Sequence, residues 1–174
     1  MGLKKLLRKY SYWRLSRSWR VLSFCRLQLD CQSFYLNGLS FGSVPAEASQ
    51  FGRPQRILAV AEEVFKFEFR ESGLILEYEK GHLNYIGVIF DYSLEAHSTF
   101  ADRAAELCVE NLNSSLTRLD RTTSLTQVLD AMGPVVDDRS DAEESLLIYH
   151  LNQHVLEFEF LLNGRLARFN LFPE

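Results

Sequence analysis

Apolar and polar residues alternate along four short segments, a period of two that is typical of β-strands with one buried face. The segments are residues 65–69, 74–79, 147–151 and 156–160. Phe65, Phe67 and Phe69 share one side of the first segment, and Tyr78 and Phe158 hold matching positions in two of the others. We therefore expect these apolar side chains to form a core-facing layer, with Tyr78 and Phe158 both buried.

Two short helices are predicted, each ahead of two of these strands. Ser43 and Ser124 are placed to cap the helices, and Gly52 and Gly133 are placed to end them in a left-handed conformation. Each helix is followed in the same order by a connection, two strands, a glycine turn and a further strand, with matching residues about 80 positions apart. This shared order predicts two diverged copies of one unit.

The expected fold is α+β, with two tandem αβββ units that form a mainly antiparallel sheet and place their helices on one face. Its parts are a basic N-terminal arm at 1–31, a first unit at 32–97, a linking helix at 98–113 and a second unit at 114–174, with 32–174 as one compact domain. The linking helix is predicted from apolar residues at helical spacing. Its last turns are alternatively a strand that leads into the second unit, since residues 34–41 look extended at the matching place in the first.

The order of capped helix, strand pair and glycine-turned hairpin resembles the repeat of β-lactamase inhibitor proteins and of the small lipoprotein in the outer-membrane barrel assembly machine. The resemblance covers roughly residues 34–92 and 114–172, and its clearest match pairs Leu76-Glu77-Tyr78-Glu79 with Leu156-Glu157-Phe158-Glu159. It implies tandem units whose strands share one sheet, and a binding role instead of catalysis. The export signal and the disulfides typical of the secreted inhibitors are not expected here.

Charge is divided unevenly along the chain, although the formal net charge at pH 7 is only −4. Residues 1–31 hold eight of the 19 Lys and Arg residues and a single acid, Asp30, so the rest of the chain has 11 bases, 22 acids and a net charge of −11. A basic arm therefore precedes an acidic domain.

Within the arm, Leu6, Tyr10 and Trp13 recur at helical spacing among basic residues, as in a helix that lies on an acidic membrane surface. Three interpretations stay open: the arm binds membrane or nucleic acid, it folds back on its own acidic domain, or it is a mispredicted translation start. We expect the arm to be separable from the fold, because its residues lack the turn and strand signals of the repeats.

The charged side of the predicted strands is the expected recognition surface. Its residues are Lys66, Glu68, Arg70, Glu77, Glu79, Glu157 and Glu159. The five carboxylates repel phosphates, which argues against nucleic-acid binding by the sheet. A protein with a basic surface suits them better, because complementary charge speeds encounter. A solvated sheet face without a binding role is the alternative.

Candidate chemical sites are few in this sequence. His150 and His154 have the i, i+4 spacing of a helical metal pair, but they lie in predicted strands, where that spacing loses its meaning. The acidic run 137–144 lacks the Gly and the bidentate Glu of a calcium loop, and we expect it to be a solvated loop. Cys108 is expected to be a buried, unreactive thiol. We therefore expect no metal, no cofactor and no enzymatic activity.

Three cysteines without a C-x-x-C pair predict no disulfide framework and favour a reducing cytoplasm. The apolar residues near the start are interrupted by Arg, Lys and Ser, so we expect no export. The preferred function is a non-enzymatic protein-binding domain, of inhibitor or immunity type, that uses the acidic sheet face. The alternatives are a structural accessory domain held at a membrane by its arm, and an enzyme whose site goes unrecognised.

Overall fold

The structure, a computed structural model, describes residues 3–22, 25–91, 105–111, 116–135, 137–139 and 144–174. Its larger sheet has the strand order β3-β4-β5-β6-β12-β11-β10-β9, and every neighbouring pair is antiparallel. The strands are β3 (Arg56–Ala59), β4 (Val64–Phe69), β5 (Leu74–Glu79), β6 (His82–Ile89), β9 (Asp137–Asp138), β10 (Glu144–Leu151), β11 (His154–Leu161) and β12 (Leu166–Pro173). The predicted α+β class with a mainly antiparallel sheet is confirmed.

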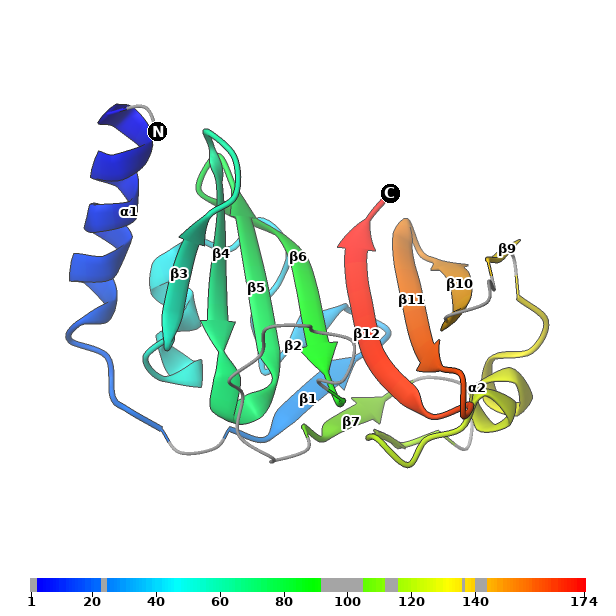
Figure 1. The fold of residues 1–174 in the computed structure, drawn as a ribbon. Helices are drawn as coiled ribbons and strands as arrows, with labels where there is room; N and C mark the ends of the chain where they lie inside the picture. Colours follow the sequence, from blue (N-terminus) through cyan, green and yellow to red (C-terminus); the bar gives the residue numbers. More distant parts are fainter. Residues whose placement is uncertain (1–2, 23–24, 92–104, 112–115, 136, 140–143) are drawn as a thin grey trace.

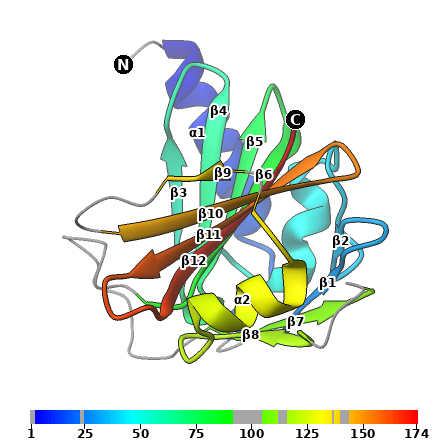
Figure 2. The same cartoon turned by 90° about the vertical axis from the view of Figure 1, so that its right-hand side faces the viewer.

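A smaller sheet and the helices complete the described part of the fold. The smaller sheet has the order β2-β1-β7-β8, from β1 (Leu27–Asp30), β2 (Tyr35–Leu36), β7 (Leu107–Glu110) and β8 (Arg118–Leu119). The helices are α1 (Leu3–Ser16), α2 (Leu125–Met132) and the 3-10 helices η1 (Pro45–Phe51) and η2 (Arg70–Ser72). In Figure 1, η1, β1 and β2 lie behind the larger sheet. Figure 2 shows α2 close to the smaller sheet.

The apolar face of the larger sheet forms the core, as the alternation predicts. Tyr78 is 0% exposed and Phe158 is 1% exposed, and the three phenylalanines of β4 are buried beside them. The ring of Phe158 packs against Phe169 of β12, with ring centroids 5.1 Å apart. Because strand residues alternate between faces, each of these strands places its other residues on the opposite side.

Three kinds of element cover this core face. Tyr12 of α1 makes an edge contact with Phe65, with ring centroids 4.9 Å apart, and Phe51 of η1 does the same with Phe69 at 5.9 Å. Val128 of α2 is fully buried. The smaller sheet packs over the centre, where its apolar side chains and those of β11 and β12 leave a space of only about 10 Å³. Helices α1, η1 and α2 thus lie on the core face of the larger sheet.

The N-terminal arm is part of the packed fold, so the expectation that it is separable was wrong. Tyr12 and Trp19 pack on the aromatic rings of β4. Residues 27–30 form β1, whose Leu27 and Leu29 are buried at the centre of the smaller sheet. The boundary at residue 31 therefore does not separate a free arm from a domain. The apolar residues that make these contacts are spread singly through a basic segment, so the sequence pattern did not reveal them.

The linking helix predicted at 98–113 is also corrected. Residues 98–104 lie outside the described residues, and 107–110 form the strand β7, which was the alternative interpretation. This strand pairs in parallel with β1, with Leu27 opposite Leu107. Cys108 therefore lies on a strand, where it is half-buried. The helical spacing of apolar residues misled the assignment. These residues form a strand because they pair with β1, a segment far away in the sequence, and local spacing does not report that pairing.

The two short helices begin differently from each other. Ser124 caps α2 as predicted, because its hydroxyl accepts a hydrogen bond from the backbone N–H of Gln127 at 3.2 Å. Ser43 is not the cap of the first helix, which begins after Val44 and is a 3-10 helix. Both helices end at the predicted glycines, Gly52 and Gly133, with φ of 81° and 79°. That φ explains the choice of glycine at both positions.

Candidate functional site

Strand register gathers the predicted recognition residues on the face of the larger sheet opposite the core. Lys66 of β4 lies opposite Glu77 of β5. In the other half of the sheet, on the same face, Glu157 and Glu159 of β11 lie opposite Asn170 and Arg168 of β12. Two groups result, which we call the first charged cluster (Lys66, Glu68, Arg70, Glu77) and the second charged cluster (Glu157, Glu159, Arg168, Asn170). Strands β6 and β12, which pair with each other, lie between β5 and β11.

Glu68 is the centre of the first charged cluster. Its carboxylate lies 3.9 Å from Lys66 Nζ and 3.5 Å from Arg70 Nη2. The register places Arg56 of the edge strand β3 opposite Glu68 as well. Arg70 is brought into this cluster by η2, the short turn of helix that ends β4. Several basic side chains thus surround one carboxylate.

Asn170 is the centre of the second charged cluster. Its side-chain N–H groups donate to Glu159 Oε1 at 2.6 Å and to Glu157 Oε2 at 3.3 Å. Its carbonyl oxygen accepts a hydrogen bond from the hydroxyl of Tyr85 on β6 at 2.5 Å. Arg168 forms an ion pair with Glu159 at 3.5 Å. One buried amide therefore holds two carboxylates and one tyrosine in fixed positions.

Tyr85 joins the two clusters across the middle of the sheet. It lies opposite Glu77 in the register, and its hydroxyl reaches Asn170 of the second charged cluster. Its ring lies over Gly87, where an added Cβ would meet the tyrosine oxygen at 2.8 Å. Gly87 is therefore needed for close approach of this ring, and not for backbone conformation.

This face is less open than the sequence suggested. Glu68 is 5% exposed and Asn170 is 4% exposed, whereas Glu79, at the far end of β5, has a side chain that is 49% exposed. Apolar residues such as Ile75 and Ile89 are buried on the same face. Long charged side chains lie along neighbouring strands and shield one another, because cross-strand neighbours are only about 5 Å apart. The expectation of a solvent-open charged face is corrected to a half-buried one.

Burial changes the acidity of two groups on this face. Burial raises the pKa of the Glu77 carboxyl above its ordinary value; nearby Lys66 opposes the rise and Glu79 adds to it. Burial also raises the pKa of the Tyr85 hydroxyl far above its ordinary value, with Arg168 opposing. Tyr85 is therefore a neutral hydrogen-bond donor at physiological pH.

Sequence reasoning missed Tyr85, Arg168 and Asn170. The signal was available for the last two, because Phe169 and Leu171 are core residues and alternation places their neighbours on the charged face. Nothing in the sequence predicted that β6 and β12 pair. That pairing brings Tyr85 to Asn170 across 85 positions of the chain.

The other candidate residues have structural partners. The ring of His154 stacks on Phe34 with centroids 4.1 Å apart, and His150 Nδ1 lies 2.5 Å from a carboxylate oxygen of Glu174. In the described part of the chain no three metal-ligating side chains gather. Asp137 and Asp138 form the edge strand β9, so the acidic run is not entirely a loop. Burial and the charge of Asp30 raise the pKa of the Cys31 thiol to about 12.

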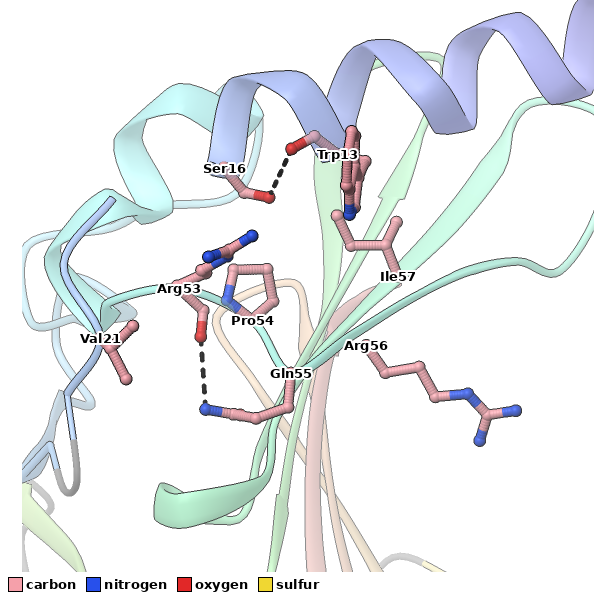
Figure 3. Close-up of a pocket in the computed structure, with 8 residues that line it drawn as sticks. All are labelled: Trp13, Ser16, Val21, Arg53, Pro54, Gln55, Arg56 and Ile57. Carbon is pink, nitrogen blue, oxygen red and sulfur yellow. Dashed lines mark hydrogen bonds between the residues drawn. The ribbon is translucent and has the colours of Figure 1, made fainter. Parts of the chain in front are cut away.

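A second surface feature lies beside α1. A space of about 320 Å³ separates the end of α1 from β3, and Figure 3 shows Trp13 reaching from the helix towards Ile57 of β3. Ser16 closes the helix by donating to the carbonyl of Trp13 at 3.1 Å. A shallower groove of about 540 Å³ runs along the helix over its exposed apolar side chains. Among the described residues, no helix has the length and apolar character needed to cross a membrane.

Neither a known protein family nor a curated protein sequence matches this chain. The fold is similar to that of a solved structure, the DUF4309 family protein YjgB from Bacillus subtilis strain 168. The TM-score is 0.51 at 13% identity, over 98% of this chain and 97% of that chain. A cysteine-rich secretory protein from Staphylococcus aureus matches with a TM-score of 0.41 and 9% identity, over 86% of this chain and 52% of that one. The likeness to YjgB shows a shared fold and carries no activity with it.

Proposed function

We propose that this protein is a non-enzymatic protein-binding domain whose charged sheet face recognises a basic segment of a partner protein. The observation that carries the proposal is an imbalance between the carboxylates of that face. Among ion pairs between described residues, Glu68 and Glu159 have cationic partners within 4.0 Å, whereas Glu77 and Glu157 have none. Glu77 and Glu157 are also half-buried.

A half-buried carboxylate that forms no ion pair is costly, because burial disfavours the charged form, and for Glu77 the nearby Lys66 only partly opposes this effect. The raised pKa of Glu77 expresses that cost. A Lys or Arg side chain from a partner would offset it and would be drawn in by complementary charge. Glu77 and Glu157 lie three inter-strand steps apart, so the partner would present two cations roughly 15 Å apart.

The hydrogen bonds that hold the charged groups in place support a role in recognition over a merely solvated surface. Asn170 fixes Glu157 and Glu159, and Tyr85 fixes Asn170. Groups held in place before binding lose little conformational entropy when a partner arrives. An inhibitor or immunity-type role fits a rigid surface of this kind.

The experiment is affinity purification of the tagged full chain followed by mass spectrometry, in parallel for two double variants. Glu77→Gln/Glu157→Gln removes the two carboxylates without changing their size, and Glu62→Gln/Asp130→Asn removes two exposed charges elsewhere as the matched control. We expect one stoichiometric partner to be retained by the original chain and the control and lost by the first variant. Added salt should slow association, because surface charges are screened over about 10 Å at 0.1 M ionic strength. A partner that is insensitive to both the first variant and salt would contradict the proposal.

We also propose that the two halves of the chain are diverged copies of one unit. Several matched features support this. Leu27 and Leu107 are paired in the parallel contact of β1 and β7. The glycines that end η1 and α2 share φ and ψ within a few degrees. Tyr78 and Phe158 hold matching core positions. The proposed resemblance to β-lactamase inhibitor proteins rests on the same repeat.

A cytoplasmic location belongs to the proposal as well. Its support is the state of the cysteines, since Cys25, Cys31 and Cys108 are all free thiols. Free thiols suit a reducing compartment.

A further inference from the structure

Helix α1 has its apolar side turned away from the protein. On its inner side, Arg8 forms an ion pair with Glu63 at 2.9 Å, Tyr12 packs on Phe65 and Ser16 is buried. The outer side bears the exposed apolar residues Leu6, Leu7 and Tyr10, and the exposed Trp13 lies at its edge, next to Ile57 of β3. A surface helix of a soluble protein normally has the reverse arrangement, with its apolar stripe against the core.

The exposed apolar residues form one continuous stripe. Leu6, Tyr10 and Trp13 follow one another at i, i+4 and i+7, and these residues are 49%, 55% and 42% exposed. The groove of about 540 Å³ along them continues from the helix onto Ile57 of β3. Figure 1 shows α1 at the outer edge of the molecule beside β3. Contiguous exposed apolar surface of this kind marks an interaction site.

Basic side chains accompany the stripe. Lys9 lines the groove, and Arg14, Arg17 and Arg20 are exposed at the end of the helix and just after it. The guanidinium of Arg17 lies 4.4 Å from the centre of the Trp13 ring. Residues 1–31 carry eight bases and one acid. The occupant of this surface must therefore be both apolar and anionic.

We propose that α1 docks this protein on the surface of an anionic lipid bilayer, with the helix lying in the interface. Leu6, Leu7 and the rings of Tyr10 and Trp13 enter the boundary between headgroups and acyl chains, and the basic residues contact lipid phosphates. The inner contacts of α1 hold the helix against β3 while its outer side faces the bilayer. A second copy of the chain fits this surface less well, because residues 1–31 carry eight bases and one acid, so pairing two copies of α1 places two basic surfaces against each other.

The experiment measures cosedimentation of the full chain with phosphatidylcholine vesicles, with and without phosphatidylglycerol, at low salt. Leu6→Ser/Leu7→Ser tests the apolar contact, and Arg14→Gln/Arg17→Gln tests the charge. The matched control is Leu162→Ser/Arg165→Gln, which removes an exposed leucine and an exposed arginine at the turn between β11 and β12. None of these side chains is buried, so all three variants should keep the thermal midpoint of the original chain.

We expect binding to the vesicles that contain phosphatidylglycerol, and weaker binding to phosphatidylcholine alone. The arginine variant should lower the partition coefficient about 25-fold, since each cation near an anionic surface contributes about fivefold. The leucine variant should lower it by at least about tenfold, and the control should leave it unchanged. Emission from Trp13, measured in a Trp19→Phe background, should shift to the blue on binding.

Three outcomes would overturn the inference. The original chain stays in the supernatant with anionic vesicles at low salt, or the control reduces binding as much as the leucine variant does. The third outcome is a concentration-dependent dimer in light scattering that Leu6→Ser/Leu7→Ser dissociates, which would assign the stripe to a second copy. The charged clusters lie on the larger sheet and not on α1. If α1 fails to bind lipid, the proposed protein recognition by the charged sheet face is therefore not affected.

Discussion

On β11, Phe158 faces the helices and the smaller sheet, whereas its neighbours Glu157 and Glu159 face the other way. The same division runs through β4, where Phe67 packs in the core and Lys66 lies on the charged face. Side chains on both faces are largely buried. The difference lies in what burial requires: apolar rings need only contact, whereas carboxylates and amides need hydrogen-bond or charge partners.

That difference separates stability from specificity in this sheet. The core face stabilises the fold by removing apolar surface area from water. This stabilisation depends little on which apolar residue is the neighbour. The charged face is stable only when particular groups meet, as when Tyr85 donates to Asn170 and Asn170 donates to Glu159. Variants on the two faces should therefore differ in size of effect and in dependence on pH.

The largest effect is expected from removing an aromatic ring on the core face. Phe158→Ala should lower the free energy of unfolding by about 3–5 kcal/mol, because removing the ring leaves a cavity that the surrounding side chains do not fill. Phe172→Ala is the matched control, since Phe172 is half-buried on the charged face against Tyr85. Its cost should be about 1 kcal/mol. Urea unfolding measures both, and similar losses for the two variants would remove the distinction between the faces.

An intermediate effect is expected from Asn170→Ala. The substitution leaves the Tyr85 hydroxyl and two carboxylates without their buried partner, which should cost about 1–3 kcal/mol. Asn84→Ala serves as the control, because among the described residues the side chain of Asn84 donates only to the exposed Glu79, and its loss should cost within about 0.5 kcal/mol. Chemical denaturation compares them. A loss for Asn170→Ala no greater than the control would show that the network adds nothing to stability.

The smallest effect is expected in the pH dependence of Glu77→Gln. Burial raises the pKa of Glu77 in the folded protein, so its charged form opposes folding above that pKa and the penalty disappears as pH falls through it. The variant should therefore be favoured over the original chain more at pH 7 than at about pH 3.5. We expect a difference below about 1 kcal/mol, because the side chain is still partly hydrated. Unfolding curves at the two pH values test the sign, and the opposite sign would mean that a cation stabilises the Glu77 carboxylate.

Part of the charged site could be predicted from sequence, because alternation alone assigns residues to a face. Lys66, Glu77 and Glu157 were placed on the correct side by that rule. The degree of burial could not be predicted, since it depends on side chains of neighbouring strands. The central role of Asn170 was also out of reach, because its partners come from β6 and β11.

The sequence by itself determined the local features of this protein. Alternation determined which face of the sheet each strand residue occupies, Ser124 determined where α2 begins, and Gly52 and Gly133 determined where η1 and α2 end. These features depend on a residue and its near neighbours, so a short stretch of chain contains all the information they need.

Only the tertiary structure decided which segments meet. The pairing of β1 with β7, the joining of β6 to β12 and the docking of α1 on β3 each bring together residues far apart in the chain. An alternating strand fits many apolar neighbours equally well, so its pattern does not name its partner. The choice depends on closing long loops and on burying the whole core at once, and it is this choice that leaves the apolar side of α1 facing outwards.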